Sequence, residues 1–437
     1  MKLYSTRQKS PIVSFHDALF RGQAPDGGLY MPASFPMLEP AKLKSLAGKP
    51  YKELACFVLS QVVGDEFSET GLADVIERAY TFSPKMSAID ARTNTLELFH
   101  GPTLSFKDFG AQFMAKSMGY FIQNENRDIT ILVATSGDTG SAVAHAYHNV
   151  EGIRIILLYP AGKVSRLQEM QLTTLGDNIL ALQVDGAFDD CQALVKQAFN
   201  DKDVREKLTL SSANSINIGR LIPQSIYYFW AVINMMASHE NDVIVCVPSG
   251  NFGNICAGLF ANQMGLPVTK YIAAVNANSV VSEYIETGEY APRPSVRTLS
   301  NAMDVGNPSN WERIRDLFAD DYQAIARKMW STSVNDDVTL ETMQRTYNKA
   351  NYIADPHTAV GLEALRRYRQ KFVEHRDMSA VVLSTAHPAK FQETVNDALG
   401  FDIELPPALA TCLRKTKQAT SMPNQYEIFK EFLWELS

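Results

Sequence analysis

The chain has 437 residues, of which 46% are hydrophobic and 20% are charged, and its formal net charge is -7 at neutral pH. An acidic chain with no long basic run is atypical of proteins that bind nucleic acid or anionic membranes, so we expect no partner of either kind. No apolar run reaches the roughly 18 residues of a membrane span and the N-terminus does not read as a signal peptide, so we expect a soluble, cytoplasmic protein.

The length itself suggests a division, because a chain of this size usually forms two or three domains. Residues 22–40 are rich in glycine and proline, and short helical segments follow them up to Tyr80. We therefore expect residues 1–95 to form a separate, mostly helical N-terminal domain. Residues 96–437 are expected to form the main region, with a small α/β subdomain at about 110–208 and a large α/β subdomain from the remainder.

The stretch HGPTLSFKDFG begins at His100 and places Lys107 between two phenylalanines, Phe106 and Phe109. Ser105 is expected to cap a helix that begins near Phe106, which puts Lys107 in the first turn. The helix dipole and partial burial both disfavour an ammonium there, so we expect a lowered lysine pKa. A neutral amine is the form that makes a Schiff base with an aldehyde. By itself, the stretch suits a surface lysine equally well.

From about residue 128, short β-branched runs alternate with helical stretches. The strand-like runs are almost entirely apolar, which is typical of strands buried on both faces. They lie at 129–134, 153–159, 179–184 and 243–247. This alternation predicts an α/β fold with parallel sheets covered by helices and with ligands at the carboxyl ends of the strands.

The loop ATSGDTGSA at 134–142 follows the first of these strands and opens a helix. Ser136, Gly137 and Thr139 offer backbone and hydroxyl donors to an anion such as a carboxylate. Asp138 is unexpected there, because its charge opposes an anion unless its carboxylate accepts from another group, such as a hydroxyl. A simple helix-capping role for these residues stays open.

Two further segments supply groups suited to a phosphate. The stretch 211–220 places Asn214 and Ser215 ahead of Arg220, which gives a cluster of donors with one guanidinium. Lys163 follows a strand, where a mobile point charge can meet an anion. A solvated loop lysine is an equally good interpretation of Lys163.

The loop PSGNFGN, Pro248–Asn254, joins a buried strand to a helix and is the strongest single signal. Gly250 and Gly253 permit close approach of the backbone, and consecutive N–H groups at a helix start form a pocket for a phosphate. The loop lacks the features of nucleotide-binding and dinucleotide-binding loops, so a monophosphate is favoured. A plain turn between strand and helix is the alternative.

No metal site is expected. Five cysteines form no CxxC pair, which predicts buried free thiols. His145 and His148 lie three residues apart on one predicted helix, but no third ligand has a suitable spacing.

Taken together, Lys107 and the two glycine-containing loops resemble the fold-type-II family of pyridoxal-phosphate enzymes. Within that family, the segments resemble those of the threonine synthases, in the same order along nearly the whole chain. The similar segments are QAPDGGLYMP at 23–32, HGPTLSFKDFG at 100–110, ATSGDTGSAVAHA at 134–146, SANSINIGRL at 212–221, PSGNFGN at 248–254, LSNAMDVGNPSNW at 299–311 and TAHPAKF at 385–391. The first of these is similar to the start of the longer, bacterial and fungal type.

This resemblance implies pyridoxal 5'-phosphate as the cofactor and the conversion of O-phospho-L-homoserine and water to L-threonine and phosphate. It also implies roles for individual residues. By this resemblance, Lys107 is the Schiff-base lysine with Phe106 beside it, and the Thr385 hydroxyl faces the pyridine nitrogen. The cofactor phosphate is surrounded by Gly250, Asn251, Phe252, Gly253 and Asn254. The substrate carboxylate is held by Ser136, Gly137, Asp138 and Thr139, and the substrate phosphate is received by Asn214, Ser215, Arg220 and Lys163. One departure is that Asn254 stands where some relatives carry Asp.

Other functions remain as alternatives. A phospho-lyase that releases 2-oxobutyrate and ammonia would use the same lysine, and a non-catalytic phosphate-binding protein would use the same fold. We expect a small-molecule substrate and a monomer or homodimer. We also expect Phe106 and Phe109 to shield the Lys107 amine from water.

Overall fold

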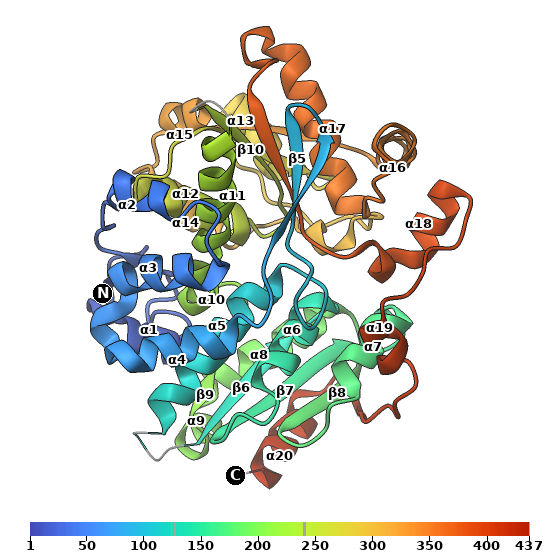
Figure 1. Cartoon of the computed structure of the whole chain (residues 1–437). Coiled ribbons are helices and arrows are strands. Elements are labelled where there is room, and N and C mark those ends of the chain that lie inside the picture. Colours follow the sequence, from blue (N-terminus) through green and yellow to red (C-terminus); the bar gives the residue numbers. More distant parts are fainter. Residues whose placement is uncertain (124, 126–127, 239–241, 437) are drawn as a thin grey trace.

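The computed structural model describes residues 1–123, 125, 128–238 and 242–436, and it contains three sheets (Figure 1). The first is a small antiparallel sheet with strand order β2-β1-β3, followed by helices. Its elements are β1 (Lys2–Ser5), β2 (Val13–Ser14), α1 (Phe15–Arg21), β3 (Tyr30–Pro32), α2 (Pro40–Ser45), α3 (Tyr51–Val63) and α4 (Glu69–Ala79). None of the helices within these described ranges is long and apolar enough to cross a membrane.

The second sheet has six strands in the order β12-β11-β10-β13-β5-β4. All neighbours pair in parallel except β4 and β5, which form an antiparallel hairpin at one edge. The strands are β4 (Lys85–Asp90), β5 (Thr93–Glu97), β10 (Val243–Pro248), β11 (Val268–Val275), β12 (Met329–Ser333) and β13 (Ser379–Ser384). The helices around it are α11 (Ser225–Ser238), α12 (Gly253–Gln263), α13 (Val280–Thr287), α14 (Trp311–Leu317), α15 (Tyr322–Lys328), α16 (Asp336–Ala350) and α17 (Pro356–Lys371).

The third sheet has five parallel strands in the order β14-β8-β7-β6-β9. Its strands are β6 (Ile129–Ala134), β7 (Ile153–Pro160), β8 (Ile179–Asp185), β9 (Leu210–Ser211) and β14 (Thr420–Pro423). Its helices are α6 (Asp138–Tyr147), α7 (Arg166–Thr173), α8 (Phe188–Asn200), α9 (Lys202–Lys207) and α20 (Tyr426–Glu435). The four apolar runs of the sequence thus form β6, β7, β8 and β10, and the predicted α/β architecture is confirmed.

Helix α5 (Lys107–Ile122) lies between the two large sheets in Figure 1. Phe109, Phe113 and Met118 on this helix are fully buried, and burial of each such side chain contributes about 1.5–3 kcal/mol. The helix packs against α4 of the N-terminal region, against α6, and against α10 (Ile218–Leu221). Because so many elements hold α5, its first residue, Lys107, has a fixed position.

The sheets cut across the domain boundaries expected from the sequence. A boundary at residue 95 falls inside β5, whereas a division before Lys85 would leave the six-stranded sheet intact. At the other end of the chain, α18 (Gln392–Leu399) and α19 (Pro407–Cys412) lead back to the five-stranded sheet. There β14 pairs with β8, and α20 packs on α8 and α9. We therefore propose that the small subdomain combines the segment near 110–208 with the C-terminal strand and helix.

Candidate active site

The candidate site is built where strands end and helices begin. β6 leads through a short loop into α6, β10 leads through a second loop into α12, and the end of β13 lies beside the segment that starts α5. Since the N-terminal end of a helix carries partial positive charge and free N–H groups, such helix starts favour anions. Both glycine-containing loops of the sequence occupy such positions.

Helix α5 begins at Lys107, one residue later than expected. The hydroxyl of Ser105 accepts a hydrogen bond from the Lys107 N–H at 3.3 Å. The carboxylate of Asp108 accepts from the Thr103 N–H at 2.9 Å and from the Thr103 hydroxyl at 2.6 Å. The buried carboxyl of Asp108 has a pKa of about 6, because burial raises the pKa more than these bonds lower it.

The amine of Lys107 is shielded mainly by groups on other elements. Its side chain is 14% exposed, and Nζ lies 3.5 Å from Oδ2 of Asp138 and 5.5 Å from the ring centroid of Phe106. Burial lowers the pKa of Lys107, and the charges of Lys390 and Arg220 lower it further against the opposing effect of Asp138. The lowered pKa predicted from the sequence is therefore confirmed, although its main causes are burial and neighbouring charges.

Phe109, expected to form a second wall beside the amine, packs elsewhere. Its ring lies 5.4 Å from the ring of Tyr51 and 4.9 Å from the ring of Phe82, measured between centroids, and it belongs to an aromatic cluster behind α5. Periodicity places Phe109 on the buried face of the helix, whereas Lys107 faces the site.

Asp138 is the acidic partner of two buried lysines. Its Oδ1 lies 2.8 Å from Nζ of Lys390 and accepts from Nε2 of Gln168 at 3.1 Å, while Oδ2 faces Lys107. Burial alone would raise the pKa of Asp138, but the two ammonium groups outweigh it and hold this pKa well below its usual range. The carboxylate therefore accepts from other groups, as expected, and these groups are an ammonium and an amide instead of a hydroxyl. Lys390 stands in the TAHPAKF segment, but no local pattern marked it as functional.

The loop between β6 and α6 presents unused backbone donors. The Thr135 hydroxyl accepts from the N–H groups of Gly137 at 3.0 Å and Gly140 at 2.9 Å, which holds the turn closed. Gly137 adopts φ 137°, a conformation that glycine tolerates. Among the described residues, none accepts a hydrogen bond from the N–H groups of Ser136, Asp138 or Thr139. An incoming carboxylate can use these donors.

The loop between β10 and α12 is equally well braced. The Asn254 amide donates to the Pro248 carbonyl at 2.8 Å, and its oxygen accepts from the Ser249 hydroxyl at 3.3 Å and from the Ile255 N–H at 2.9 Å. Asn254 therefore holds the loop in shape, which accounts for an amide at this position. A Cβ on Gly250 would lie 2.5 Å from Cα of Met303, so only glycine fits there.

Backbone donors of this second loop also lack partners. Phe252 adopts a left-handed conformation with φ 59°, and α12 starts at the next residue. The N–H groups at positions 251–254 donate to no other group in the part of the chain that the structure describes. The predicted phosphate-binding pocket is thus available at the helix start.

Ser215 belongs with the glycine loop. The Asn251 side chain donates to the Ser215 hydroxyl at 2.6 Å and accepts from the Ser309 N–H at 2.6 Å. The Asn310 amide donates to the Asn251 carbonyl at 3.1 Å, and the buried Arg313 donates to Asn310 at 2.6 Å. The bracing role of Asn310 and Arg313 was not predicted, although the NPSNW part of the sequence contains one of them.

The other residues predicted to bind the substrate phosphate differ in their exposure to solvent. Arg220 is 2% exposed and donates from Nη1 to the Ala213 carbonyl at 2.7 Å, and burial lowers its pKa to about 10. Nε of Arg220 and Oδ1 of Asn214 are buried with no hydrogen-bond partner among the described groups. Lys163, in contrast, lies exposed in the loop after β7.

These features fit pyridoxal phosphate. A largely buried amine with a lowered pKa, a helix start whose N–H groups have no partner among the described residues, and the buried Arg220 Nε, a donor that likewise has no partner among them, supply the groups that an aldehyde and two phosphates require. Thr385 is 6% exposed, and its carbonyl accepts from the Phe106 N–H at 2.9 Å, which ties it to the segment that carries Lys107. The residues present therefore fit the cofactor that the sequence implies.

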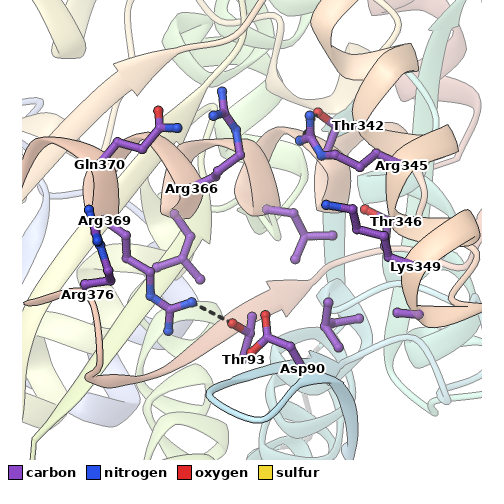
Figure 2. Close-up of a pocket in the computed structure, with 14 residues that line it drawn as sticks. Asp90, Thr93, Thr342, Arg345, Thr346, Lys349, Arg366, Arg369, Gln370 and Arg376 are labelled. Carbon is purple, nitrogen blue, oxygen red and sulfur yellow. Dashed lines mark hydrogen bonds between the residues drawn. The ribbon is translucent and has the colours of Figure 1, made fainter. Parts of the chain in front are cut away.

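Two pockets elsewhere are not part of this site. One of about 570 Å³ lies between α16, α17 and the β4–β5 turn (Figure 2). Its cationic lining residues are Arg345, Lys349, Arg366, Arg369 and Arg376. Arg345 and Arg366 bind the buried Glu363. Arg369 donates to the hydroxyl of Thr93, the first residue of β5, whereas the segment that carries Lys107 follows the other end of this strand. The other, of about 720 Å³, lies among α2, α3 and α4.

Comparison with known proteins places this chain in a family. Family models match three parts of it: "Threonine synthase N terminus" at 2–80, "Pyridoxal-phosphate dependent enzyme" at 95–385 and "Threonine synthase, C-terminal" at 358–433. The threonine synthase of Serratia marcescens is 41% identical over 100% of both chains, and that of Escherichia coli K12 is 41% identical over 94% of both.

Solved structures agree with this result. A pyridoxal-phosphate-bound threonine synthase from Brucella melitensis superposes with a TM-score of 0.94 at 36% identity, covering 100% of this chain and 99% of that one. The Escherichia coli threonine synthase superposes with a TM-score of 0.91 at 38% identity over 100% of both chains. The chain therefore belongs to the threonine synthase family of pyridoxal-phosphate-dependent enzymes, with the fold-type-II architecture expected from its sequence.

Proposed function

We propose that the chain converts O-phospho-L-homoserine and water to L-threonine and phosphate. Membership of the threonine synthase family supports this reaction. The observation that carries it is the position of the Lys107 amine, which lies 3.5 Å from Asp138 in a loop that has N–H donors without partners among the described residues. Two separate anion sites are what a phosphorylated cofactor and a phosphorylated substrate require.

The proposed cofactor site uses residues from three segments. Lys107 would bind the aldehyde of pyridoxal phosphate, with Phe106 beside it, and the Thr385 hydroxyl would interact with the pyridine nitrogen. The cofactor phosphate is held by the loop that contains Gly250, Asn251, Phe252, Gly253 and Asn254. Bound pyridoxal phosphate supplies an electron-accepting ring that stabilises negative charge on the substrate carbons.

The proposed substrate site uses the other loop and the buried cluster. Ser136, Gly137 and Thr139 hold the substrate carboxylate through backbone and hydroxyl donors, and Asp138 anchors the loop. Arg220 is proposed to receive the substrate phosphate through Nε, a buried donor with no hydrogen-bond partner among the described groups, and Asn214 through its amide N–H group. Ser215 and Lys163 are proposed to contribute at its edge.

Lys107 is proposed to move the protons. Once the substrate occupies the site, the neutral amine takes a proton from Cα and then from Cβ, so that phosphate can leave from Cγ. Return of a proton to Cγ and addition of water at Cβ complete L-threonine. The lowered pKa of this amine suits a base that acts near neutral pH.

The direct test is product analysis. The purified chain is incubated with pyridoxal phosphate and O-phospho-L-homoserine, and phosphate, threonine and 2-oxobutyrate are measured together. Equal amounts of phosphate and threonine are expected from the wild type. Lys107→Ala is expected to lose this activity by at least about 100-fold, since removal of a general base costs this much or more.

Other outcomes of this test identify the alternative functions. Release of 2-oxobutyrate with phosphate would identify a phospho-lyase. No turnover, together with no absorption band near ~410 nm on addition of the cofactor, would identify a phosphate-binding protein without a Schiff-base lysine.

The location, oligomeric state and partners of the enzyme are also proposed. We propose that it acts in the cytoplasm as a monomer or homodimer and has no nucleic-acid partner, as its acidic net charge of -7 supports. Sedimentation of the purified protein measures its oligomeric state.

A further inference from the structure

Lys390 is a second buried lysine beside the amine of Lys107. It lies in the short helix η5 (Pro388–Phe391) that follows β13, and its side chain is fully buried. Nζ lies 2.8 Å from Oδ1 of Asp138 and donates to the Thr103 carbonyl at 3.0 Å. A buried ammonium costs several kcal/mol unless it is paired and hydrogen-bonded. The position of Lys390 therefore depends on Asp138.

The carboxylate of Asp138 is shared unequally between the two lysines. Oδ1 is bound by Lys390 and by Gln168, whereas Oδ2 lies 3.5 Å from Lys107. The second distance exceeds the roughly 2.7–2.9 Å of a charge-assisted hydrogen bond. Asp138 is thus bound to Lys390 and only loosely associated with Lys107.

We propose that Lys390 is a positioning residue of the active site, which neutralises Asp138 and so prevents that carboxylate from binding Lys107 as an ammonium. No role in the proposed reaction has been given to Lys390 above. The inference rests on the proposed function only for the roles of Lys107 and of the loop at 136–139.

The first consequence concerns the amine. With Lys390 charged, a proton on Lys107 would place two positive charges against one buried carboxylate, which is unfavourable. In agreement, the pKa of Lys107 is lowered by burial first, and the charge of Lys390 acts in the same direction while Asp138 opposes both. Without Lys390, Asp138 would be free to bind Lys107 and hold its proton.

The second consequence concerns the loop between β6 and α6. An ionised Asp138 within this loop would repel a substrate carboxylate that approaches the N–H groups of Ser136 and Thr139. Lys390 compensates this charge from the side of the carboxylate that binds Gln168. The loop can then bind an anion although it contains an acidic residue.

Four other titratable groups interact with Lys390 or Lys107. Asp108 on α5 has a pKa of about 6, and burial lowers the pKa of His145 on α6 to about 4. Burial likewise lowers the pKa of His387, and it lowers that of Arg220 on α10 to about 10. Between about pH 7 and 9 these four groups keep their charge states, so a change in this window reports on the lysines.

The test is the pKa of Lys107 in the full-length protein before cofactor is added. Trace acetylation with acetic anhydride at a series of pH values, followed by peptide mass spectrometry, measures the free amine at Lys107. In Lys390→Met the pKa of Lys107 is expected to rise by about one unit, which is roughly tenfold less free amine at a given pH. An unchanged or lower pKa in the folded variant would overturn the proposal.

Matched variants separate charge from packing. Lys116→Met removes a lysine from α5 whose Nζ donates to the Ala146 carbonyl at 3.3 Å, away from Asp138, and should leave the Lys107 pKa unchanged. Lys390→Arg keeps the charge and should keep the lowered pKa. In Lys390→Met/Asp138→Asn the carboxylate is absent as well, so the pKa should return toward the wild-type value.

A second variant covers a failure to fold. If Lys390→Met alone is unfolded, Lys390→Gln, which keeps a neutral hydrogen-bonding group beside Asp138, is compared with the wild type. The Lys107 pKa should then be higher in Lys390→Gln, and an unchanged or lower pKa would overturn the proposal. Acetylation uses neither cofactor nor substrate, so a failure of the proposed enzyme activity leaves this result intact and can be recognised separately.

Discussion

The two glycine-containing loops have the same local design but different charge. Each follows a buried parallel strand, opens a helix and leaves N–H groups that have no partner within the described part of the chain. The loop at 248–254 contains no ionisable side chain and is braced by the amides of Asn251 and Asn254. The loop at 135–141 contains Asp138, whose charge is balanced by Lys390 and Lys107.

This difference matches the proposed ligands. A phosphate with up to two negative charges is best held by uncharged donors, because a nearby carboxylate would repel it. The second loop must bind a single carboxylate beside the amine that takes part in the reaction, so an acidic residue is tolerated when buried lysines compensate it. Backbone geometry thus provides both loops with an anion site, and side-chain charge adapts each to its task.

The largest effect is expected from adding a charge to the uncharged loop. Asn251→Asp would place a carboxylate in the proposed cofactor-phosphate pocket, at a cost of about 3 kcal/mol per unit charge at ~5 Å. The affinity for pyridoxal phosphate, measured by fluorescence titration, should fall by at least about 100-fold. Asn251→Ala is the control, since it loses the hydrogen bonds with Ser215 and Ser309 without adding charge, and should fall less. Equal losses would contradict a purely electrostatic difference between the loops.

A smaller effect is expected from adding a methyl group. In Gly250→Ala the new Cβ would meet the backbone of Met303 at 2.5 Å, and overpacking of this kind costs about 1–3 kcal/mol. Both the unfolding free energy and the cofactor affinity should fall. Gly400→Ala is a control for adding a methyl group, because its Cβ meets nothing within 4 Å although its φ of 77° adds local strain. Cofactor affinity equal to that of the wild type in Gly250→Ala would show that this loop is free to move.

Removal of the brace inside the same loop should cost less. Asn254→Ala removes the hydrogen bonds that the Asn254 side chain makes with the Pro248 carbonyl and the Ser249 hydroxyl, and loss of buried hydrogen bonds typically costs about 1–3 kcal/mol. Urea unfolding should show this loss, with weaker cofactor binding. Asn254→Asp keeps an acceptor for the Ile255 N–H and should lose less stability than the alanine variant. The reverse order would contradict the bracing role.

The smallest effect is a dependence on pH that only the charged loop can cause. Because the two lysines hold the pKa of Asp138 below its unfolded value of 3.8, its ionisation stabilises the fold above that pH and loses this contribution as the pH falls below it. The difference in unfolding free energy between wild type and Asp138→Asn should be constant from pH 7 to about 4.5 and shrink below about 3.8. A difference that grows on acidification would contradict the ion pairs.

The sequence was most informative where function depends on contiguous residues. The strand at 129–134, a helix start within one residue of the observed one and the loop at 248–254 were each predicted, because apolar runs, glycines and capping residues determine them locally. The pairs Lys390–Asp138 and Ser215–Asn251 were not predicted, since only the packing of distant segments brings them together. The pairing of β14 with β8 in the five-stranded sheet depends on long-range packing in the same way.

The identity of the cofactor-binding lysine is tested most directly by mapping it. Two lysines, Lys107 and Lys390, lie on either side of one carboxylate, and only Lys107 is expected to bind pyridoxal phosphate. The purified protein is treated with the cofactor, reduced with borohydride to fix any Schiff base, digested and analysed by mass spectrometry. Modification confined to the peptide that contains Lys107, and absent from Lys107→Ala, is the predicted result. Modification of Lys390, or of neither lysine, would contradict the assignment.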